Sequence, residues 1–436
     1  MENIYGQRFL PIPDEKAPLK AIQYFVWFFA WLALVLDVMD WQLLSVSAST
    51  ILDEFKFPKA AMGLLLGAPL LGAGIGGLIS GWLSDKYGRV RVMVYCLIWY
   101  SVFTVAFAYS NSYEMMLALR IIVGIGLGAQ WGVGNTLVAE VMPARLRIMC
   151  SAVIQTGFAF GPMLSAYAAK MILPSYGWRP LFYVGAVGLI MAVLAKFVIA
   201  EPEAWLKRRH EAKAGMVKMG HIPQLFYPEL RLKTICAFGL VWFTLLAYWG
   251  AMSWIPNWLV AERGMNIVKS MDYLMWLNVG GVFGYVVFAL IADRWGRKPP
   301  AYVTLIASFV TVIAFVNITE PTAMLAFAPV FAFITYPIFG LYGGYLSELF
   351  PTEIRATAVN GIYNLARMTA FFAPGILGAI ASSFSMTAAI GFTAFLYLGS
   401  LLPLFFLPET HKKAKQLLAK AGAGAMAVET VSTKDK

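Results

Sequence analysis

The chain has 436 residues, of which 60% are hydrophobic and only 13% charged, and its formal net charge is +11. Soluble domains are about half apolar and about a quarter charged, so this composition excludes a water-soluble protein and indicates one that is integral to a membrane. The positive charge does not imply nucleic acid as a partner, because basic residues of membrane proteins gather in their cytoplasmic loops.

Apolar runs long enough to cross a bilayer recur along the whole chain. They are continuous rather than alternating, which favours helices over a membrane β-barrel. The sequence therefore predicts an all-α membrane protein with twelve transmembrane helices. The expected spans are 23–50, 59–82, 92–110, 114–140, 149–172, 180–199, 234–260, 271–292, 301–318, 322–347, 357–380 and 386–407.

The basic residues set the expected orientation of these spans. When the N-terminus is placed in the cytoplasm, about four-fifths of the lysines and arginines fall in inner loops and tails, as the positive-inside rule requires. We therefore expect both termini to be cytoplasmic. The predicted cytoplasmic parts are an N-terminal segment at 1–22, a linker at 200–232 and a disordered tail at 408–436.

A repeat divides the chain into two similar parts. The segment DKYGR at 85–89 matches DRWGR at 293–297, which lies 208 positions later. Glu140 and Arg147 match Glu348 and Arg355 at the same offset. Many secondary transporters are built from duplicated halves and bind their substrate between them, near the bilayer midplane. We expect two pseudo-symmetric six-helix bundles, at 23–199 and 233–407.

Two acids interrupt the first apolar span, where a charge is costly and therefore marks a candidate functional site. Asp37 and Asp40 are three residues apart, so on a helix they share one face, with Cβ atoms about 5–6 Å apart. Two carboxylates this close in a medium of low dielectric constant are not expected to be ionised together, and they would titrate as a pair. Proton coupling is the role that this pattern favours. The alternative is a structural ion pair between one of them and an arginine such as Arg120.

Arg367 lies near the middle of the span predicted at 357–380. Its guanidinium stays charged and presents a planar fork of donors that fits a carboxylate, so we expect it to hold an anionic substrate. The alternative is that Arg367 pairs with Asp37 or Asp40 and joins the two halves. Other polar residues inside the spans could contact the substrate or form helix–helix hydrogen bonds instead. These candidates are Tyr363, Asn364, Gln130, Gln155 and Asn278.

Several motifs resemble those of the major facilitator superfamily, over essentially the whole chain. GWLSDKYGRVR at 81–91 is similar to the signature between its second and third helices, and ALIADRWGRK at 289–298 is a weaker copy. EVMPARLR, ELFPTEIR and RIIVGIGLG are similar to its other conserved segments. The resemblance implies alternating access, a role for Arg120 at the proton site, and a cytoplasmic gate. The gate residues would be Gly81, Asp85, Gly88, Arg89, Glu140, Arg147, Asp293, Arg297, Glu348 and Arg355.

Three stretches resemble the bacterial proton symporters of organic acids, which include sialate/lactate and aromatic-acid transporters. They are the acids at 37 and 40, GIGLGAQWGVGNTLVAE in the fourth span and IYNLARMTAFFAPGILG in the eleventh. Many such proteins carry a glutamate where this chain has Gln130. If that glutamate is their proton site, either another acid holds the proton here or the coupling differs. The resemblance implies a monomer in the inner membrane of a bacterium that imports a small organic anion with a proton.

No arrangement of residues typical of an enzyme is found, and we expect neither a metal nor a cofactor; the proton gradient would supply the energy. Three other functions stay open at this point. The first is a proton-driven exporter of drugs or cations, in which the two aspartates bind the positive charge. The second is a neutral-sugar carrier, to which AEPEAWL at 200–206 is similar. The third is a membrane sensor without transport, for which the linker at 200–232 is too short to be a signalling domain.

Overall fold

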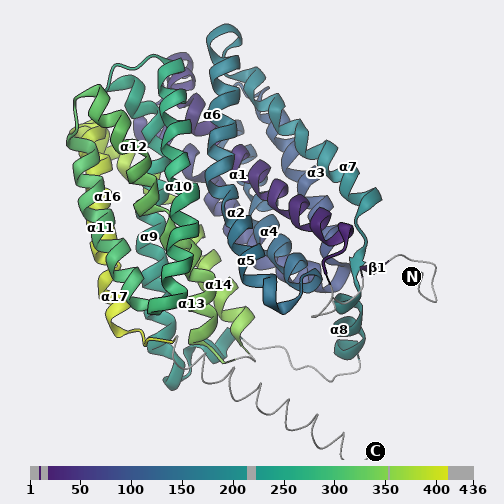
Figure 1. The fold of residues 1–436 in the computed structure, drawn as a ribbon. Helices are drawn as coiled ribbons and strands as arrows, with labels where there is room; N and C mark the ends of the chain where they lie inside the picture. The colour runs from purple at the N-terminus through teal and green to yellow at the C-terminus, as the bar shows by residue number, and fades with distance from the viewer. Residues whose placement is uncertain (1–8, 11–17, 214–221, 352–353, 411–436) are drawn as a thin grey trace, which may run out of the picture.

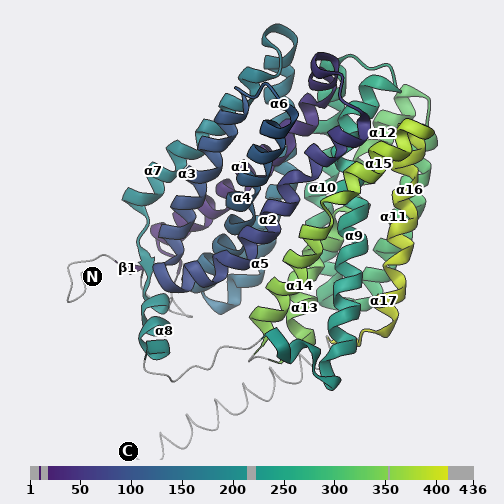
Figure 2. The ribbon, with the colours of Figure 1, turned by 180° about the vertical axis from the view of Figure 1, so that it is seen from behind.

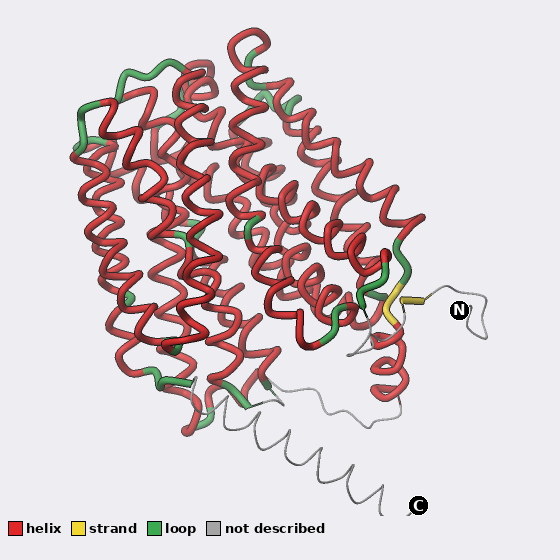
Figure 3. Tube along the Cα trace, viewed as in Figure 1, coloured by secondary structure: helices red, strands yellow, loops and turns green. Residues whose placement is uncertain are grey.

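The computed structural model describes residues 9–10, 18–213, 222–351 and 354–410. Almost all of them are helical (Figure 3). The first half of the chain forms one group of long helices, drawn in purple to blue in Figure 1. Its helices are α1 (Ala21–Phe55), α2 (Lys59–Tyr87), α3 (Arg89–Phe107), α4 (Tyr113–Val141), α5 (Ala144–Gln155), α6 (Gly157–Tyr176), the 3₁₀ helix η1 (Arg179–Ala186) and α7 (Val187–Val198).

The second half forms a similar group beside the first, drawn in teal to yellow (Figure 1). Between the groups lie the short helix α8 (Glu203–Lys213) and the 3₁₀ helix η2 (Ile222–Phe226). The helices of the second group are α9 (Pro228–Ala261), α10 (Ile267–Trp295), α11 (Lys298–Asn317), α12 (Pro321–Thr335), α13 (Pro337–Leu349), α14 (Arg355–Thr369), α15 (Phe372–Ser383), α16 (Met386–Gly399) and α17 (Leu401–Phe406).

Eleven helical segments of the described chain are long and apolar enough to cross a membrane. The all-α membrane fold is therefore confirmed. The span predicted at 149–172 is not among the eleven. It corresponds to α5 and α6, which are separate helices on either side of Thr156. The count of twelve stays a prediction.

The boundaries of several elements differ from those expected. α1 runs from Ala21 to Phe55 rather than over 23–50, because a helix continues past the apolar residues that define a span. α9 begins at Pro228, inside the predicted linker at 200–232. A two-stranded parallel sheet joins β1 (Phe9–Leu10) to β2 (Glu201–Pro202). Two-residue strands leave no periodic signal in a sequence, so this pairing was not expected.

Local structure repeats at the same offset of 208 positions as the sequence. Gly88 and Gly296 both have positive φ, 114° and 105°, at the starts of α3 and α11. The carboxylate of Glu201 accepts hydrogen bonds from the backbone N–H groups of Val90 and Arg91, and Glu409 accepts from those of Arg297 and Lys298. Each acid thus caps a helix N-terminus, where a negative charge is favourable. These equivalent contacts support the two-bundle plan.

The two halves meet on the side of the molecule away from α8. Along α1 and α9, residues related by the repeat touch each other. The Trp41 and Trp249 rings stack at 4.6 Å, and Ser45 donates to the Ser253 carbonyl at 2.7 Å. Figure 2 shows the helices of the two halves spreading apart toward the end that carries α8. The contact between α1 and α9 therefore lies close to the axis that relates the halves.

Glycines allow α2 of the first half to approach α14 and α15 of the second. A Cβ added to Gly63 would collide with the Pro374 carbonyl, and one added to Gly67 would collide with the Phe371 carbonyl. Such close backbone approach is the usual reason for small residues where membrane helices cross. The interface between α2 and α15 is therefore closed at the level of the backbone.

Candidate substrate and proton site

Asp40 is held by an ion pair inside the first half. α1 places its carboxylate against α4, where Arg120 Nη1 lies 3.1 Å from Asp40 Oδ1, and neither side chain is exposed. Arg120 Nη2 also donates to the Asp40 backbone carbonyl at 3.2 Å, and the Thr104 hydroxyl on α3 donates to Oδ2. This arrangement matches the structural alternative that the sequence left open for one of the two acids.

Asp37 lies on the same helix less than one turn away, in a different environment. Its side chain is 4% exposed, and its Oδ1 is buried without a hydrogen-bond partner among the described residues. The nearby charges that act on it are Arg367, which belongs to the other half, and Asp40. An ionised carboxylate is costly to bury without partners. The two acids that the sequence treats alike are therefore not equivalent.

Arg367 is 4% exposed and lies on α14 in the second half. Its guanidinium lies over the Tyr363 ring, 4.8 Å from the centroid. Tyr363 is one helical turn from Arg367, so both side chains share a face. α14 also brings Asn364 against α2, because a Cβ added to Gly77 would collide with Asn364 Oδ1. Asn364 thus lies in the contact between the two halves.

The remaining predicted contacts have different surroundings. Both side-chain polar atoms of Gln130 are buried without a hydrogen-bond partner among the described residues. Asn278 Oδ1 accepts a hydrogen bond from the Tyr336 hydroxyl at 2.9 Å, and Asn278 Nδ2 donates to the Leu274 carbonyl at 2.8 Å. Gln155 is the last residue of α5 and is partly buried. All three lie in helices, but no interaction that links them to one another is observed among the described residues.

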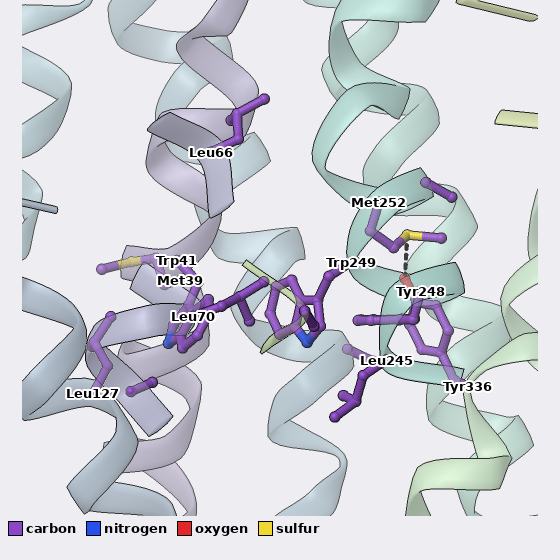
Figure 4. Packing of buried hydrophobic residues seen from close by; sticks show 14 of the residues in the cluster. Met39, Trp41, Leu66, Leu70, Leu127, Leu245, Tyr248, Trp249, Met252 and Tyr336 are labelled. Carbon is purple, nitrogen blue, oxygen red and sulfur yellow. Dashed lines mark hydrogen bonds between the residues drawn. The ribbon is translucent and has the colours of Figure 1, made fainter. Parts of the chain in front are cut away.

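An aromatic surface extends from the contact between the halves into the second half (Figure 4). Trp249 stacks on Trp41 of the first half, and its neighbour Tyr248 meets the Tyr336 ring at 5.3 Å with an interplanar angle of 77°. Phe339 lies 4.8 Å from Tyr248 on another side. Edge-to-face packing of this kind fixes ring positions, and the Trp249, Tyr248 and Tyr336 rings are buried in the core of the protein.

Four of the predicted gate residues form one ion pair in each half. Arg89 Nη2 lies 3.2 Å from Glu140 Oε1, and Arg297 Nη2 lies 2.9 Å from Glu348 Oε1. These pairs occupy equivalent positions of the repeat. Gly88 is the residue with positive φ before α3, and Arg355 is exposed at the start of α14. A Cβ added to Gly81 would meet nothing within 4 Å. The side chains of Asp85, Arg147 and Asp293 lie outside the described residues.

Sequence reasoning missed several residues that support this arrangement. Thr104 gave no signal, because a threonine in an apolar span is common. Glu201 and Glu409 could have been found by applying the offset of 208 to every acid. Burial raises the pKa of Glu201, and the hydrogen bonds from the backbone N–H groups of α3 oppose that shift. Lys170 and Asp272 form a 2.7 Å ion pair between α6 and α10, at the end where the halves meet.

Comparison with known proteins identifies the family. Residues 30–370 match the model of the Major Facilitator Superfamily. The chain belongs to that superfamily. A cis,cis-muconate transport protein of Acinetobacter baylyi is 31% identical over 89% of this chain and 95% of its own length. The major facilitator relatives also include a sialic acid transporter of Escherichia coli, 26% identical over 86% of this chain and 93% of its own length. A gallate transporter of Pseudomonas putida is 25% identical over 84% and 88%.

These matches confirm that the chain resembles transporters of organic acids, and they make it a membrane transporter rather than an enzyme. Solved structures agree on the major facilitator fold. The crystal structure of a D-xylose-proton symporter has a TM-score of 0.70 and 19% identity, over 89% of this chain and 98% of that one. The likeness to the xylose symporter extends to the fold alone.

Proposed function

We propose that this transporter imports a small organic anion together with a proton across the inner membrane of a bacterium. The observation that carries the proposal is the environment of Asp37. Oδ1 of this buried carboxylate has no hydrogen-bond partner among the described residues, and the positive charge acting on Asp37 is Arg367 of the other half. A carboxylate and a guanidinium on opposite sides of the substrate path can exchange partners with a proton and an anion. The acids named for the relatives support an anionic substrate.

Arg367 would hold the substrate carboxylate through its planar fork of donors. When Asp37 is ionised, its charge competes with the substrate for Arg367. A proton on Asp37 removes this competition and also removes the cost of a buried charge. Protonation and anion binding would therefore favour each other, which is the thermodynamic requirement for symport.

Asp40 and Arg120 would have a supporting role. Because their charges compensate each other and Thr104 donates a further hydrogen bond, Asp40 is well accommodated as an anion. The pair joins α1 to α4 and fixes the position of Asp37 one turn along the helix. Loss of the pair would therefore displace Asp37 and disturb coupling indirectly.

Movement of one half against the other would expose the site to each side of the membrane in turn. With the N-terminus in the cytoplasm, the end that carries α8 faces inward and the contact between α1 and α9 closes the outer side. Glu140, Arg89 and their counterparts in the second half would act at the inner gate. The protein would function as a monomer without a cofactor.

Uptake into proteoliposomes tests this function. The purified chain is reconstituted and given labelled muconate, gallate, nicotinate and sialate, with and without a pH gradient that is acidic outside. We expect accumulation of at least one acid only with the gradient, and its loss when a protonophore is added. Accumulation of an acid without the pH gradient would overturn the proposed proton coupling. Uptake of xylose or of an organic cation, with no uptake of any of the acids, would instead favour a sugar carrier or an exporter.

A further inference from the structure

A cavity of about 20 Å³ lies between the two halves, beside the aromatic surface. α1 and α6 of the first half contribute Gln42 and Ser165, and α10 of the second half contributes Asn278. Tyr336 and Met252 complete its polar side, where the Tyr336 hydroxyl lies 3.5 Å from the Met252 sulfur (Figure 4). Both halves therefore supply groups to one small chamber.

Gln42 is the least satisfied polar group of this cavity. Its side chain is 7% exposed, and its amide forms no hydrogen bond with any residue that the structure describes. A glutamine amide offers two N–H donors and one carbonyl acceptor. Its polar atoms are not fully buried, unlike those of Gln130, so a partner can reach them from the cavity and stabilise the amide there. A ligand group that enters the cavity would provide the missing hydrogen bonds.

The other polar groups leave bonding capacity on the same side. Asn278 uses one N–H on the Leu274 carbonyl and accepts from the Tyr336 hydroxyl, so its second N–H remains. Ser165 donates to the Pro162 carbonyl at 2.9 Å, and its oxygen can still accept. None of the described residues that line the cavity carries a charge. The chamber therefore suits an uncharged hydrogen-bonding group rather than a second carboxylate.

Size and position restrict that group further. A cavity of this volume holds about one water molecule, which is close to the size of a hydroxyl. Gln42 follows Trp41, whose ring stacks on Trp249, and Tyr336 packs edge-on against Tyr248. α14, which carries Tyr363 and Arg367, packs against α9, which carries Tyr248. The packing of α9 against α14 thus connects the aromatic rings beside the cavity with the arginine proposed to bind the anion.

We propose that Gln42, together with Asn278 and Tyr336, forms a specificity subsite that accepts an uncharged hydroxyl of the substrate, distant from the carboxylate bound at Arg367. In the empty carrier a water molecule takes the place of that hydroxyl. The substrate class is then a planar acid with a ring hydroxyl. This inference rests on the proposed function, because it takes the anion to be bound at Arg367.

Equilibrium binding tests the subsite. The full chain is placed in lipid nanodiscs, and calorimetry gives the Kd for benzoate and for its 3- and 4-hydroxy derivatives. Gln42→Met replaces the amide with an apolar chain of the same length, and Asn278→Leu is the equivalent change in the other half. Asn317→Leu is the control, since its amide donates to the Ile313 carbonyl at the end of α11 and does not line the cavity.

We expect one hydroxybenzoate to bind the unsubstituted chain about tenfold more tightly than benzoate does, the size of effect expected for a buried hydrogen bond. Gln42→Met and Asn278→Leu should each reduce this ratio to about one while the Kd of benzoate changes by less than about twofold. Asn317→Leu should keep the ratio. The subsite is wrong if hydroxylation brings no gain in the unsubstituted chain, or if the ratio survives both substitutions.

The same measurements separate the two proposals. If the unsubstituted chain binds none of the three benzoates, the subsite fails, and calorimetry with muconate and sialate then decides whether the anion site fails as well. If benzoate binds and Arg367→Gln abolishes that binding, the anion site stands whatever the hydroxyl ratio is. If Gln42→Met does not fold, Asn278→Leu decides the result alone.

Discussion

Asp40 and Arg120 form an ion pair, 3.1 Å long, in which both side chains are completely buried within the first half of the protein. Buried pairs contribute little net stability, yet removing one partner leaves an uncompensated charge that costs about 3–5 kcal/mol. Asp37, on the same helix, lacks such a partner among the described residues. The first span therefore separates a structural acid from one that can change its protonation state.

Arg120→Leu should lower the thermal stability of the purified protein strongly, because Asp40 is then left as a buried charge. Asp40→Asn should be similarly harmful, whereas the double variant should recover part of the loss. Melting temperatures of the two single variants and the double variant in detergent form the test. Additive losses would mean that the two charges do not interact.

Asp37→Asn should abolish accumulation driven by a pH gradient while leaving anion exchange intact. The substitution keeps the shape of the side chain and removes only the ability to gain and lose a proton. It should also leave the melting temperature within a few degrees of the unsubstituted protein, since no hydrogen bond of the described residues is lost. Gradient-driven uptake and counterflow in the same proteoliposomes are the measurements.

Asp272→Asn is the control for Asp37→Asn, because it removes a carboxylate from the half-exposed ion pair with Lys170. Exposed pairs of this kind contribute about 0–1 kcal/mol. Accumulation should survive this change. Accumulation that persists in Asp37→Asn, or that disappears equally in both variants, would contradict a specific role for Asp37.

Arg367→Lys should raise the KM for the anion by about tenfold, because an ammonium group keeps the charge but loses the bidentate fork, and a hydrogen bond between charged groups contributes about 1.5–3 kcal/mol. Arg367→Gln should abolish binding. Concentration dependence of counterflow gives the KM without reference to the proton gradient. An unchanged KM in Arg367→Lys would exclude bidentate contact.

Gly63→Ala should prevent the two halves from closing at the end away from α8, because the added methyl would collide with the Pro374 carbonyl. A single cysteine in place of Ser49, in a background without the native cysteines, reports on this closure by its rate of reaction with an impermeant maleimide. We expect faster labelling when Gly63→Ala is added. Gly343→Ala, where the extra methyl would meet nothing within 4 Å, should leave the rate unchanged.

Much of the architecture follows from simple features of the sequence. Eleven of the twelve spans expected from the apolar runs are long apolar helices of the described chain, and the offset of 208 predicted two similar halves. The structure also joins residues related by this offset, because Asn257, 208 positions after Ser49, donates a hydrogen bond of 3.0 Å to the Ser49 hydroxyl. Residues on a symmetry axis touch their own equivalents, which a repeat alone does not reveal.

The distribution of partners within the site could not be predicted. Asp37 and Asp40 share a helix face, so periodicity treats them alike, and only the packing of α3 and α4 gives Thr104 and Arg120 to Asp40. Gln42 was not among the candidate site residues predicted from the sequence. An isolated amide in an apolar span carries no local signal, and its significance appears only once α6 and α10 close a cavity around it.

The measurement that tests the central claim most directly is the proton flux that accompanies substrate entry. A pH-sensitive dye inside the proteoliposomes records acidification when a transported acid is added outside without an imposed pH gradient. We predict acidification with the unsubstituted protein and none with Asp37→Asn, although the Asp37→Asn protein still exchanges labelled anion. Equal acidification by both proteins would show that the coupled proton is carried elsewhere.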